Sequence, residues 1–218
     1  MFTLAFDTTT NFCSIALFEN QSLKDIFSLE LNFGQSEVLI PQIQTMLEKN
    51  NLSIQKLDLL SVCTGPGSFT GVRSSVSAAR AFGLSNKNLA LCGVSAFEAY
   101  ASNLPQSERA ERIGVIIETK REDFYVAYFD RDLKKVDAPK TAFFDDILHD
   151  LKQTSVTLTG DGVSRFLAKQ TGLKIHNAFF ETHPPIEQIA LVAAKRFNAK
   201  TLDFPKPLYL KAADVCAK

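Results

Sequence analysis

The segment CTGPGSFTGVRSS, residues 63–75, decides the fold of this chain, because it places three glycines and a proline directly after an apolar run. Residues 57–63 (LDLLSVC) have the continuous apolar character of a buried strand. Residues from Ser68 to Phe82 have the spacing of a helix, and Gly83 is a suitable left-handed helix end. The segment therefore predicts a tight connection from a buried strand into a helix over residues 68–82.

The glycines of this segment do not match the two common phosphate-binding motifs. A P-loop needs four residues between its glycines and then a lysine, whereas five residues separate Gly65 from Gly71, and Val72 and Arg73 follow. A dinucleotide fingerprint needs glycines at positions 1, 3 and 6, and here they fall at 1, 3 and 7. A looser anion site at the helix N-terminus and a turn that needs positive φ angles both stay open.

The helix itself carries small residues on nearly every side. Arg73 lies in its first turn, where the helix dipole disfavours a cation, which indicates an anionic partner in this chain or in another. A small-residue surface lets another backbone approach closely. Either a partner helix or the sheet of the chain itself can occupy that surface. The small residues are Ser74, Ser75, Ser77, Ala78, Ala79 and Ala81.

The first hundred residues predict a strand meander followed by alternating helices and strands. Short turns separate the first three strands, which favours antiparallel neighbours. A helix with Ser36 as its N-cap closes at 50–51. The expected strands are 2–6, 13–20, 23–31, 57–63 and 89–94, and a third helix covers 95–102. This order is that of a ribonuclease H-like lobe.

The second half predicts a similar but reduced lobe. A polar, proline-containing stretch at 101–112 marks the boundary, so we expect an N-terminal lobe over 1–104 and a C-terminal lobe over 105–218. We expect the tail 205–218 to cross back to the first lobe. The expected strands are 113–119, 123–130 and 134–140, and the expected helices are 143–152 and 183–197, with a strand, glycine turn and helix over 155–170.

Charge and hydropathy exclude several classes of protein. Lys and Arg together number 24, as do Asp and Glu, and a balanced chain lacks the basic excess that unaided nucleic-acid binding requires. No apolar run approaches the ~20 residues of a membrane span. Asp7 interrupts the N-terminus too early for a signal peptide. We therefore expect a cytoplasmic protein that does not enter a membrane.

Cysteine and histidine spacing disfavours a metal centre. Cys13, Cys63, Cys92 and Cys216 form no CxxC pair, and their spacing is typical of buried apolar residues. The three histidines never fall at i, i+4, and no Ser–His–Asp or Cys–His set can be assembled. The sequence therefore predicts no metal ligand and no catalytic residue.

Two polar segments remain as candidates. Asp7, Thr8, Thr9 and Thr10 form a turn between two strands that can hold a metal–phosphate group or bond to its own backbone. Residues 118–125 (ETKREDFY) cluster charge between two apolar strands, as a solvated hairpin does.

Three stretches resemble one family. LAFDTTTNFCSIAL, GQSEVLIPQIQTML and above all GPGSFTGVR are similar to the TsaB (YeaZ) family of tRNA threonylcarbamoyladenosine biosynthesis proteins. The resemblance covers about the first hundred residues well and the second half loosely. Residues 118–125 stand where the family tends to have a DAR-type segment, and Gln35 stands where many relatives have His.

The resemblance implies a fold and a role. The fold is the two-lobed actin-like ATPase (ASKHA) fold of class α/β, ribonuclease H-like, with a reduced second lobe. The role is that of a non-catalytic scaffold for its paralogue TsaD, which forms the threonylcarbamoyl group on adenosine 37 of ANN-decoding tRNAs. The chain would then be no enzyme by itself but a subunit of a threonylcarbamoyltransferase complex, with TsaE as an ATPase partner.

The resemblance further implies that the complex uses ATP while this chain holds no cofactor, and that tRNA is reached only through the complex. A homodimer through the same surface is implied for the isolated chain. The interface would consist of Ser36, Leu39, Ile40, Ile43, Gly67, Ser68, Phe69, Thr70, Gly71, Arg73, Ser75, Ala78 and Ala79. Two alternatives remain: a free-standing actin-like ATPase or kinase that uses Asp7 and Thr8–Thr10, and a protease that acts on TsaD.

Overall fold

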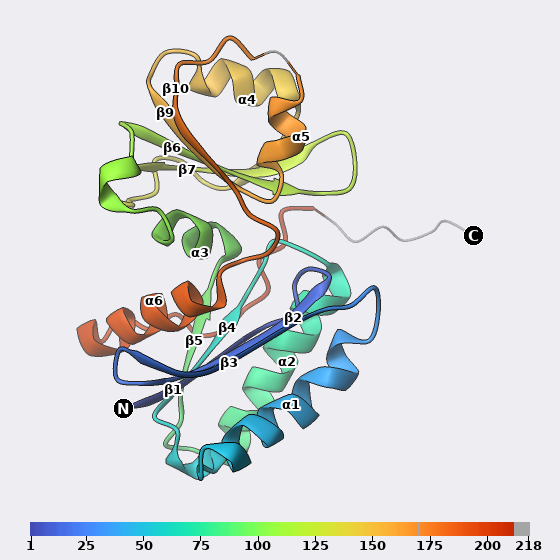
Figure 1. Ribbon diagram of the computed structural model, residues 1–218, viewed down its shortest axis with the longest axis vertical. Helices are drawn as coiled ribbons and strands as arrows, with labels where there is room; N and C mark the ends of the chain where they lie inside the picture. Colours follow the sequence, from blue (N-terminus) through green and yellow to red (C-terminus); the bar gives the residue numbers. More distant parts are fainter. Residues whose placement is uncertain (170, 212–218) are drawn as a thin grey trace. The chain divides into compact units, whose positions relative to one another are not determined.

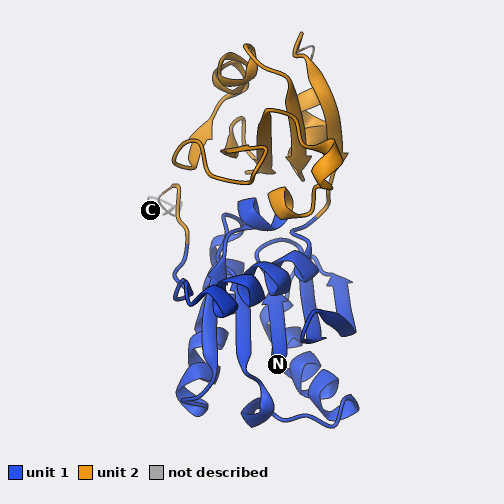
Figure 2. Cartoon of the chain, turned by 90° about the vertical axis from the view of Figure 1, so that its left-hand side faces the viewer, with its two compact units in different colours: residues 1–99, 183–207 blue, residues 100–182, 208–218 orange. Residues whose placement is uncertain are grey.

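The computed structural model describes residues 1–169 and 171–211, which form two compact units. Unit 1 contains residues 1–99 and 183–207, and unit 2 contains residues 100–182 and the tail from 208 (Figure 2). The predicted division at 104 lies within a few residues of the change at 99/100. The predicted second lobe, however, included 183–207, which pack with unit 1. Residues 212–218, the remainder of the predicted tail, lie outside the described residues, as does Cys216.

Unit 1 is built on a five-stranded mixed sheet with the order β3-β2-β1-β4-β5. The first three strands pair antiparallel, and β1–β4 and β4–β5 pair parallel. The elements are β1 (Phe2–Asp7), β2 (Phe12–Glu19), β3 (Ser22–Glu30), α1 (Gln35–Lys49), η1 (Ile54–Lys56), β4 (Leu59–Cys63), α2 (Phe69–Ser85), β5 (Ala90–Val94) and, later in the chain, α6 (Ile186–Ala199). Helix α3 (Ala96–Ser102) carries the chain into unit 2.

Helices cover both faces of this sheet. Helices α1 and α2 lie on one face and α6 lies on the other (Figure 1). Phe6, Ile15 and Leu17 of the sheet are fully buried against Leu39 and Ile43 of α1. Burial of such side chains, worth about 1.5–3 kcal/mol each, explains the continuous apolar runs of the strands.

Unit 2 repeats the topology of unit 1. Its sheet has the order β10-β9-β6-β7-β8, with the β6–β7 and β7–β8 pairs antiparallel and the β6–β9 and β9–β10 pairs parallel. The elements are η2 (Gln106–Glu108), β6 (Arg112–Glu118), β7 (Phe124–Asp130), β8 (Lys140–Ala142), α4 (Phe144–Leu151), β9 (Val156–Gly160), α5 (Val163–Leu167) and β10 (Ile175–Phe180).

Several predicted element ends were wrong. Helix α1 begins at Gln35 after Gly34, whose φ of 89° is left-handed, so Ser36 is not its N-cap. Helix α2 continues past Gly83 to Ser85. A Cβ at Gly83 would lie 2.6 Å from Leu91 Cδ1, so the glycine lets the helix approach β5. The predicted strand 134–140 contributes an isolated bridge at Lys135, and the regular strand starts only at Lys140. Strand β10 was not predicted.

Three cysteines lie in the described part of the chain, and Cys13, Cys63 and Cys92 are all buried free thiols. None of the helices in residues 1–169 and 171–211 combines the length and the apolar character that a membrane span requires.

Candidate functional site

The polar turn after β1 lies against the start of α2. Strands β1 and β4 are parallel neighbours, so their carboxyl ends share one edge of the sheet. Asp7 ends β1 and Thr8–Thr10 follow it, while residues 64–68 connect β4 to α2. This edge is where open α/β sheets most often bind ligands. The two segments singled out in the sequence therefore meet in space.

The turn and the helix are joined by hydrogen bonds. The Thr8 amide donates to Ser75 Oγ at 3.0 Å, and the Thr8 hydroxyl donates to the Gly71 carbonyl at 2.8 Å. The hydroxyls of Thr8 and Ser75 also lie 2.8 Å apart. The Ser68 amide donates to the Thr9 carbonyl at 2.7 Å. These bonds occupy groups that a phosphate cradle would have to offer to a ligand.

The glycines of residues 63–75 allow this close contact. A Cβ at Gly67 would collide with the carbonyl oxygen of Thr9, and a Cβ at Gly71 would collide with that of Thr8. Backbone atoms cannot turn aside as a side chain can, so glycine is required at both positions. Only Gly65 of the segment takes a positive φ, 90°. The glycine pattern is thus explained mainly by the approach of two backbones.

Asp7 is completely buried beside this contact. Its Oδ1 accepts a hydrogen bond from the Thr9 amide at 2.8 Å, and burial raises the pKa of the carboxyl to about 6. Its Oδ2 has no hydrogen-bond partner within residues 1–169 and 171–211. The Thr9 hydroxyl contacts Cys63 Sγ at 3.6 Å, and burial raises the pKa of that thiol well above its usual range.

The remaining candidate of the turn is also engaged locally. Thr10 Oγ1 accepts a hydrogen bond from the Phe12 amide at 3.2 Å, as in a serine/threonine turn. Thr8 and Thr9 are buried, and Thr10 is half-buried. In the described residues, no three His, Cys, Asp or Glu side chains gather as metal ligands. The turn is joined to α2 through the Thr8 hydroxyl, whereas the Thr9 and Thr10 hydroxyls contact β4 and β2.

The predicted interface residues divide into an outward and an inward set. Leu39 and Ile43 belong to the core of unit 1, and the α2 residues Gly71, Ser75 and Ala79 are buried as well. These five predicted interface residues are covered by unit 1 itself, because the small face of α2 packs on the sheet of its own chain. Gly67 and Ala78 are half-buried, and the exposed members are Ser36, Ile40, Ser68, Phe69, Thr70 and Arg73.

The exposed members lie on adjoining stripes of α1 and α2. The hydroxyls of Ser36 and Ser74 lie 2.8 Å apart and join the two helices. Ile40 is 46 % exposed one turn further along α1. On α2, the Arg73 guanidinium stacks 4.3 Å from the ring centroid of Phe69. We call these exposed residues, together with Phe33, the α1–α2 face.

Phe33 was missed by the sequence reasoning. It directly precedes Gly34 at the start of α1, and its side chain is 90 % exposed. The loop that carries it is held by Gln35, whose side-chain nitrogen Nε2 donates to the Leu31 carbonyl at 2.9 Å. Together with the exposed Ile40 and Phe69, it adds apolar surface of the kind that interaction anchors use. A single apolar residue in a loop gives no sequence signal of its exposure.

The charged segment 118–125 is ordered by Arg165 of α5. The guanidinium makes two hydrogen bonds to the Glu118 carboxylate, at 2.7 and 2.8 Å, and one to the Asp123 carbonyl at 2.8 Å. It also stacks 3.7 Å from the centroid of the Phe124 ring. Asp161 accepts from the Glu118 amide, and burial with the nearby Glu118 charge raises its pKa to about 7. Lys211 pairs with Asp123.

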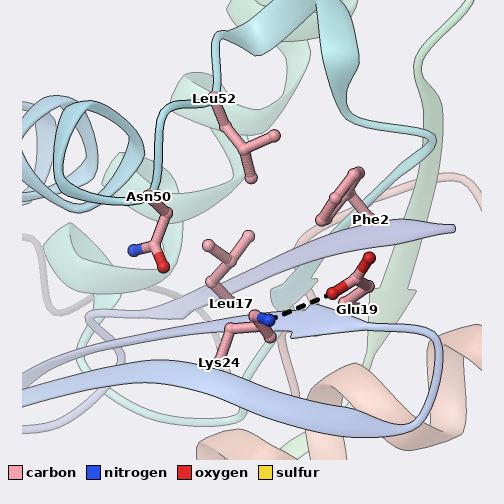
Figure 3. A pocket seen from close by; sticks show the side chains of 6 residues that line it. All are labelled: Phe2, Leu17, Glu19, Lys24, Asn50 and Leu52. Atoms are coloured by element: carbon pink, nitrogen blue, oxygen red, sulfur yellow. Dashed lines mark ion pairs between the residues drawn. The ribbon is translucent and has the colours of Figure 1, made fainter.

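An open hollow lies elsewhere in unit 1. Phe2, Leu17 and Leu52 form its apolar base, and Glu19 and Lys24 pair across its rim at 3.1 Å (Figure 3). It adjoins the start of β1 and the β2–β3 turn, at the opposite end of the sheet from Asp7. It therefore adds no ligand group to the site at the carboxyl ends of the strands.

The fold defines a class of protein. Two units that each build the same five-stranded mixed sheet form an actin-like ATPase fold. A protein of unknown function from Bacteroides thetaiotaomicron with an actin-like ATPase fold superposes with a TM-score of 0.51 and 9 % identity, covering 88 % of this chain and 95 % of that one. YeaZ from Pseudomonas aeruginosa superposes with a TM-score of 0.79 and 17 % identity, covering 96 % and 99 %.

The sequence identifies the family. The family model described as TsaD, tRNA N6-adenosine threonylcarbamoyltransferase, matches residues 34–215. The tRNA threonylcarbamoyladenosine biosynthesis protein TsaB of Escherichia coli (strain K12) is 28 % identical over 219 residues, with 95 % of this chain and 94 % of that protein covered. The chain belongs to the TsaD family of this model and, within it, to the TsaB (YeaZ) group, as the resemblance predicted.

Proposed function

We propose that this chain is a non-catalytic partner of TsaD in forming the threonylcarbamoyl group on adenosine 37 of ANN-decoding tRNAs. The names of its relatives support a place in this modification pathway. In this proposal TsaE is a further ATPase partner, ATP is consumed by the complex, and tRNA is reached only through the complex. The protein acts in the cytoplasm, where tRNA is modified.

One observation carries the assignment of a supporting role. The Thr8 hydroxyl is a group that could bind a phosphate at this turn, but it bonds instead to Gly71 and Ser75 of the same chain. A phosphate oxygen at this turn would have to displace α2 from the sheet. The Thr9 and Thr8 carbonyls occupy the space beside Gly67 and Gly71, where a ligand would otherwise approach. We therefore infer that the motif positions a helix. A positioned helix with an exposed face serves docking.

The α1–α2 face is the surface that this role would use. It combines exposed apolar side chains, Phe33, Ile40 and Phe69, with one cation, Arg73. Within the described ranges no carboxylate pairs with Arg73. A carboxylate on the partner would neutralise the Arg73 charge and offset its unfavourable interaction with the positive end of the helix dipole. When the chain is alone, a second copy can occupy the same face.

A second candidate is an actin-like nucleotide enzyme. Its support is the buried Asp7 Oδ2 at the carboxyl end of β1, which has no hydrogen-bond partner within the described residues. Binding of ATP by the isolated chain, lost in Asp7→Ala, would favour this candidate. The protease alternative requires fragments of TsaD to appear on incubation with the chain.

The proposal is tested by reconstitution of threonylcarbamoyl transfer to tRNA. Purified TsaD and TsaE are assayed with and without this chain, and the chain is assayed alone. We expect product only when the chain is added to both other proteins. Turnover by the chain alone, or full activity in its absence, would contradict the scaffold role and return attention to Asp7.

A further inference from the structure

The sheet of unit 1 carries polar side chains on the face that α6 covers. Helix α6 packs on β1 and β4. Successive side chains of a strand point to opposite faces, and the strand neighbours of Thr3, Asp7 and Ser61 pack in the core with α1 and α2. Thr3, Asp7 and Ser61 therefore point to the α6 side of the sheet. Their strand neighbours in that core are Leu4, Phe6, Leu60 and Val62.

All three side chains are fully buried and have an oxygen without a partner in the protein. The exposed fraction of Thr3, Asp7 and Ser61 is 0 %. Within residues 1–169 and 171–211, no hydrogen bond reaches Thr3 Oγ1, Asp7 Oδ2 or Ser61 Oγ. Most buried polar atoms are hydrogen-bonded to protein or to ordered water, because an unsatisfied atom keeps the full cost of its desolvation. Three unsatisfied oxygens on one face therefore point to a shared partner outside the chain.

The strand register places the three side chains beside one another. Ser61 is the direct neighbour of Ala5 in the parallel β1–β4 pair. Thr3 and Asp7 lie two residues before and two residues after Ala5 on β1. With strands about 4.8 Å apart and a rise of about 3.3 Å per residue, Ser61 is about 8 Å from each of them between Cα atoms. A water molecule that bonds to two such side chains can bridge this separation.

Small side chains surround these polar groups. Ala5 lies among them on β1, and Ala16 of β2 is its direct neighbour. On α6, Ala190 and Ala193 are buried. Alanine fills less of the layer between helix and sheet than the phenylalanine and leucine side chains of the opposite face do. A buried water needs room for one molecule and about two to four polar partners, and this layer supplies such partners.

Ser14 of β2 is a satisfied counterpart on the same face. It is the direct neighbour of Asp7 and is equally buried. Its hydroxyl lies 2.9 Å from that of Ser28 on β3. These two hydroxyls satisfy each other, so the need for an outside partner is confined to β1 and β4.

The arrangement fits water better than a metal ion. Thr3 and Asp7 are four residues apart on β1, which separates their Cα atoms by about 13 Å. A Ca²⁺ or Mg²⁺ ion requires several oxygens at about 2.0–2.6 Å from one point, whereas these oxygens are spread along the strands. In the described part of the chain, no three His, Cys, Asp or Glu side chains gather as metal ligands.

We propose that internal water molecules bound between β1, β4 and α6 are a structural component of unit 1, with Ser61 Oγ as their shared ligand. One water joins Ser61 to Thr3 Oγ1, and a second joins it to Asp7 Oδ2. A serine hydroxyl donates one hydrogen bond and accepts two, so Ser61 can bond to both waters. The site lies on the opposite side of the sheet from the α1–α2 face and does not depend on the function proposed for that face.

The sign of a stability change tests the proposal. Thr3→Val keeps the shape of the side chain and a high strand propensity but removes the hydroxyl. With water bound, the variant loses a hydrogen bond, and we expect the equilibrium constant for unfolding of unit 1 to rise about fivefold. In a dry site, a methyl group in place of an unpartnered hydroxyl would lower that constant. Ser61→Ala removes a ligand of both waters and should raise the constant further.

Thr64→Val is the matched control in the same unit. The Thr64 hydroxyl has a partner within the chain, since it donates to the Val94 carbonyl at 3.3 Å. Its loss should raise the unfolding constant whether or not water occupies the α6 side. Hydrogen exchange of the Leu4 amide, in the central strand, measures the opening of unit 1 in all three variants.

A high-resolution crystal structure provides the direct measurement. We expect density for a water within hydrogen-bond distance of Ser61 Oγ and of Thr3 Oγ1 or Asp7 Oδ2. The absence of such density would overturn the proposal, as would a metal ion in its place. The proposal would also fail if Thr3→Val and Ser61→Ala unfold no more readily than the natural chain while Thr64→Val does.

Discussion

The hydroxyl oxygens of Ser75 in α2 and Thr8 after β1 lie 2.8 Å apart in the interior of unit 1. Ser75 also accepts the hydrogen bond of the Thr8 amide. A buried amide that loses its acceptor keeps the full cost of its desolvation. This pair therefore joins the helix that carries the glycine motif to the central strand of the sheet.

Replacing Ser75 with Ala should destabilise unit 1 by about 1–3 kcal/mol, because the Thr8 amide is left buried without an acceptor. Ser77→Ala, at an exposed position of the same helix, is the matched control and should change stability by less than about 0.5 kcal/mol. Urea denaturation of both variants measures the difference. Equal stabilities would mean that the Thr8 contact contributes little.

The two glycines of α2 should respond differently to alanine. Gly71→Ala drives a Cβ into the backbone carbonyl of Thr8, which cannot move without displacing the turn, so we expect loss of several kcal/mol or failure to fold. Gly83→Ala meets only the Leu91 side chain, and the helix gains about 1 kcal/mol of intrinsic propensity. Gly83→Ala should therefore be close to neutral. Thermal unfolding distinguishes the two, and comparable losses would refute the backbone-contact explanation.

The buried carboxyl of Asp7 makes stability depend on pH. Its pKa is raised by burial from 3.8 to about 6, so the folded state binds its proton more tightly than the unfolded state does. The corresponding stabilisation is complete below about pH 4 and is lost as pH rises through 6. Asp7→Asn lacks this titration while its amide oxygen can still accept from Thr9.

The stability of Asp7→Asn relative to the natural chain should therefore increase by about 2–2.5 kcal/mol between pH 4 and pH 7. Other titrating groups, Asp161 included, are common to both proteins and cancel in the difference. Denaturant titrations at several pH values provide the measurement. A stability difference that does not vary with pH would show that burial does not raise the pKa of Asp7.

Arg165 should determine the order of the segment 118–125. Arg165→Ala removes the forked bond to Glu118, the bond to the Asp123 carbonyl and the stacking on Phe124. Because the Arg165 side chain is partly exposed, solvent screening limits the expected loss to about 1–2 kcal/mol. Hydrogen exchange of the β6–β7 connection should accelerate, whereas Arg131→Ala, at an exposed site, should leave it unchanged.

An aspartate on the α1–α2 face should weaken binding to TsaD without unfolding the chain. Ile40→Asp places a charge on a 46 % exposed apolar residue of that face, and we expect at least a tenfold rise in Kd. Ile26→Asp on β3 starts from a similar exposure, 43 %, and serves as the control. Isothermal titration calorimetry measures both. Equal affinities for the two variants would place the partner elsewhere.

The sequence predicted the fold better than it predicted the surface. Apolar runs were enough to place β1, β2 and β4, because a strand buried on both faces must be apolar on both, and a short turn placed the more exposed β3. Side-chain exposure is a property of the packed structure. Ser75 and Ala79 are small residues that the sequence reasoning placed at an interface, but they lie on the buried side of α2. Phe33 is a residue type common in cores, but it is exposed.

Glycine was the residue most open to misinterpretation. Gly83 fits the pattern of a helix end, yet its lack of a side chain is used for contact with Leu91 inside a continuing helix. Local sequence cannot distinguish a glycine needed for its φ angle from one needed for clearance. Strand β10 was missed because four of its six residues, IHNA, lack an alternating or continuous apolar pattern.

The return of residues 183–207 to unit 1 has a consequence for synthesis of the chain. Helix α6 packs on β1, β2, β4 and β5, yet it follows these strands by about a hundred residues in the sequence. At roughly 5–20 residues per second, a ribosome needs on the order of 5–20 s to supply it. For that time one apolar face of the nascent sheet has no cover from its own chain. During this interval the uncovered face can aggregate unless a chaperone binds it.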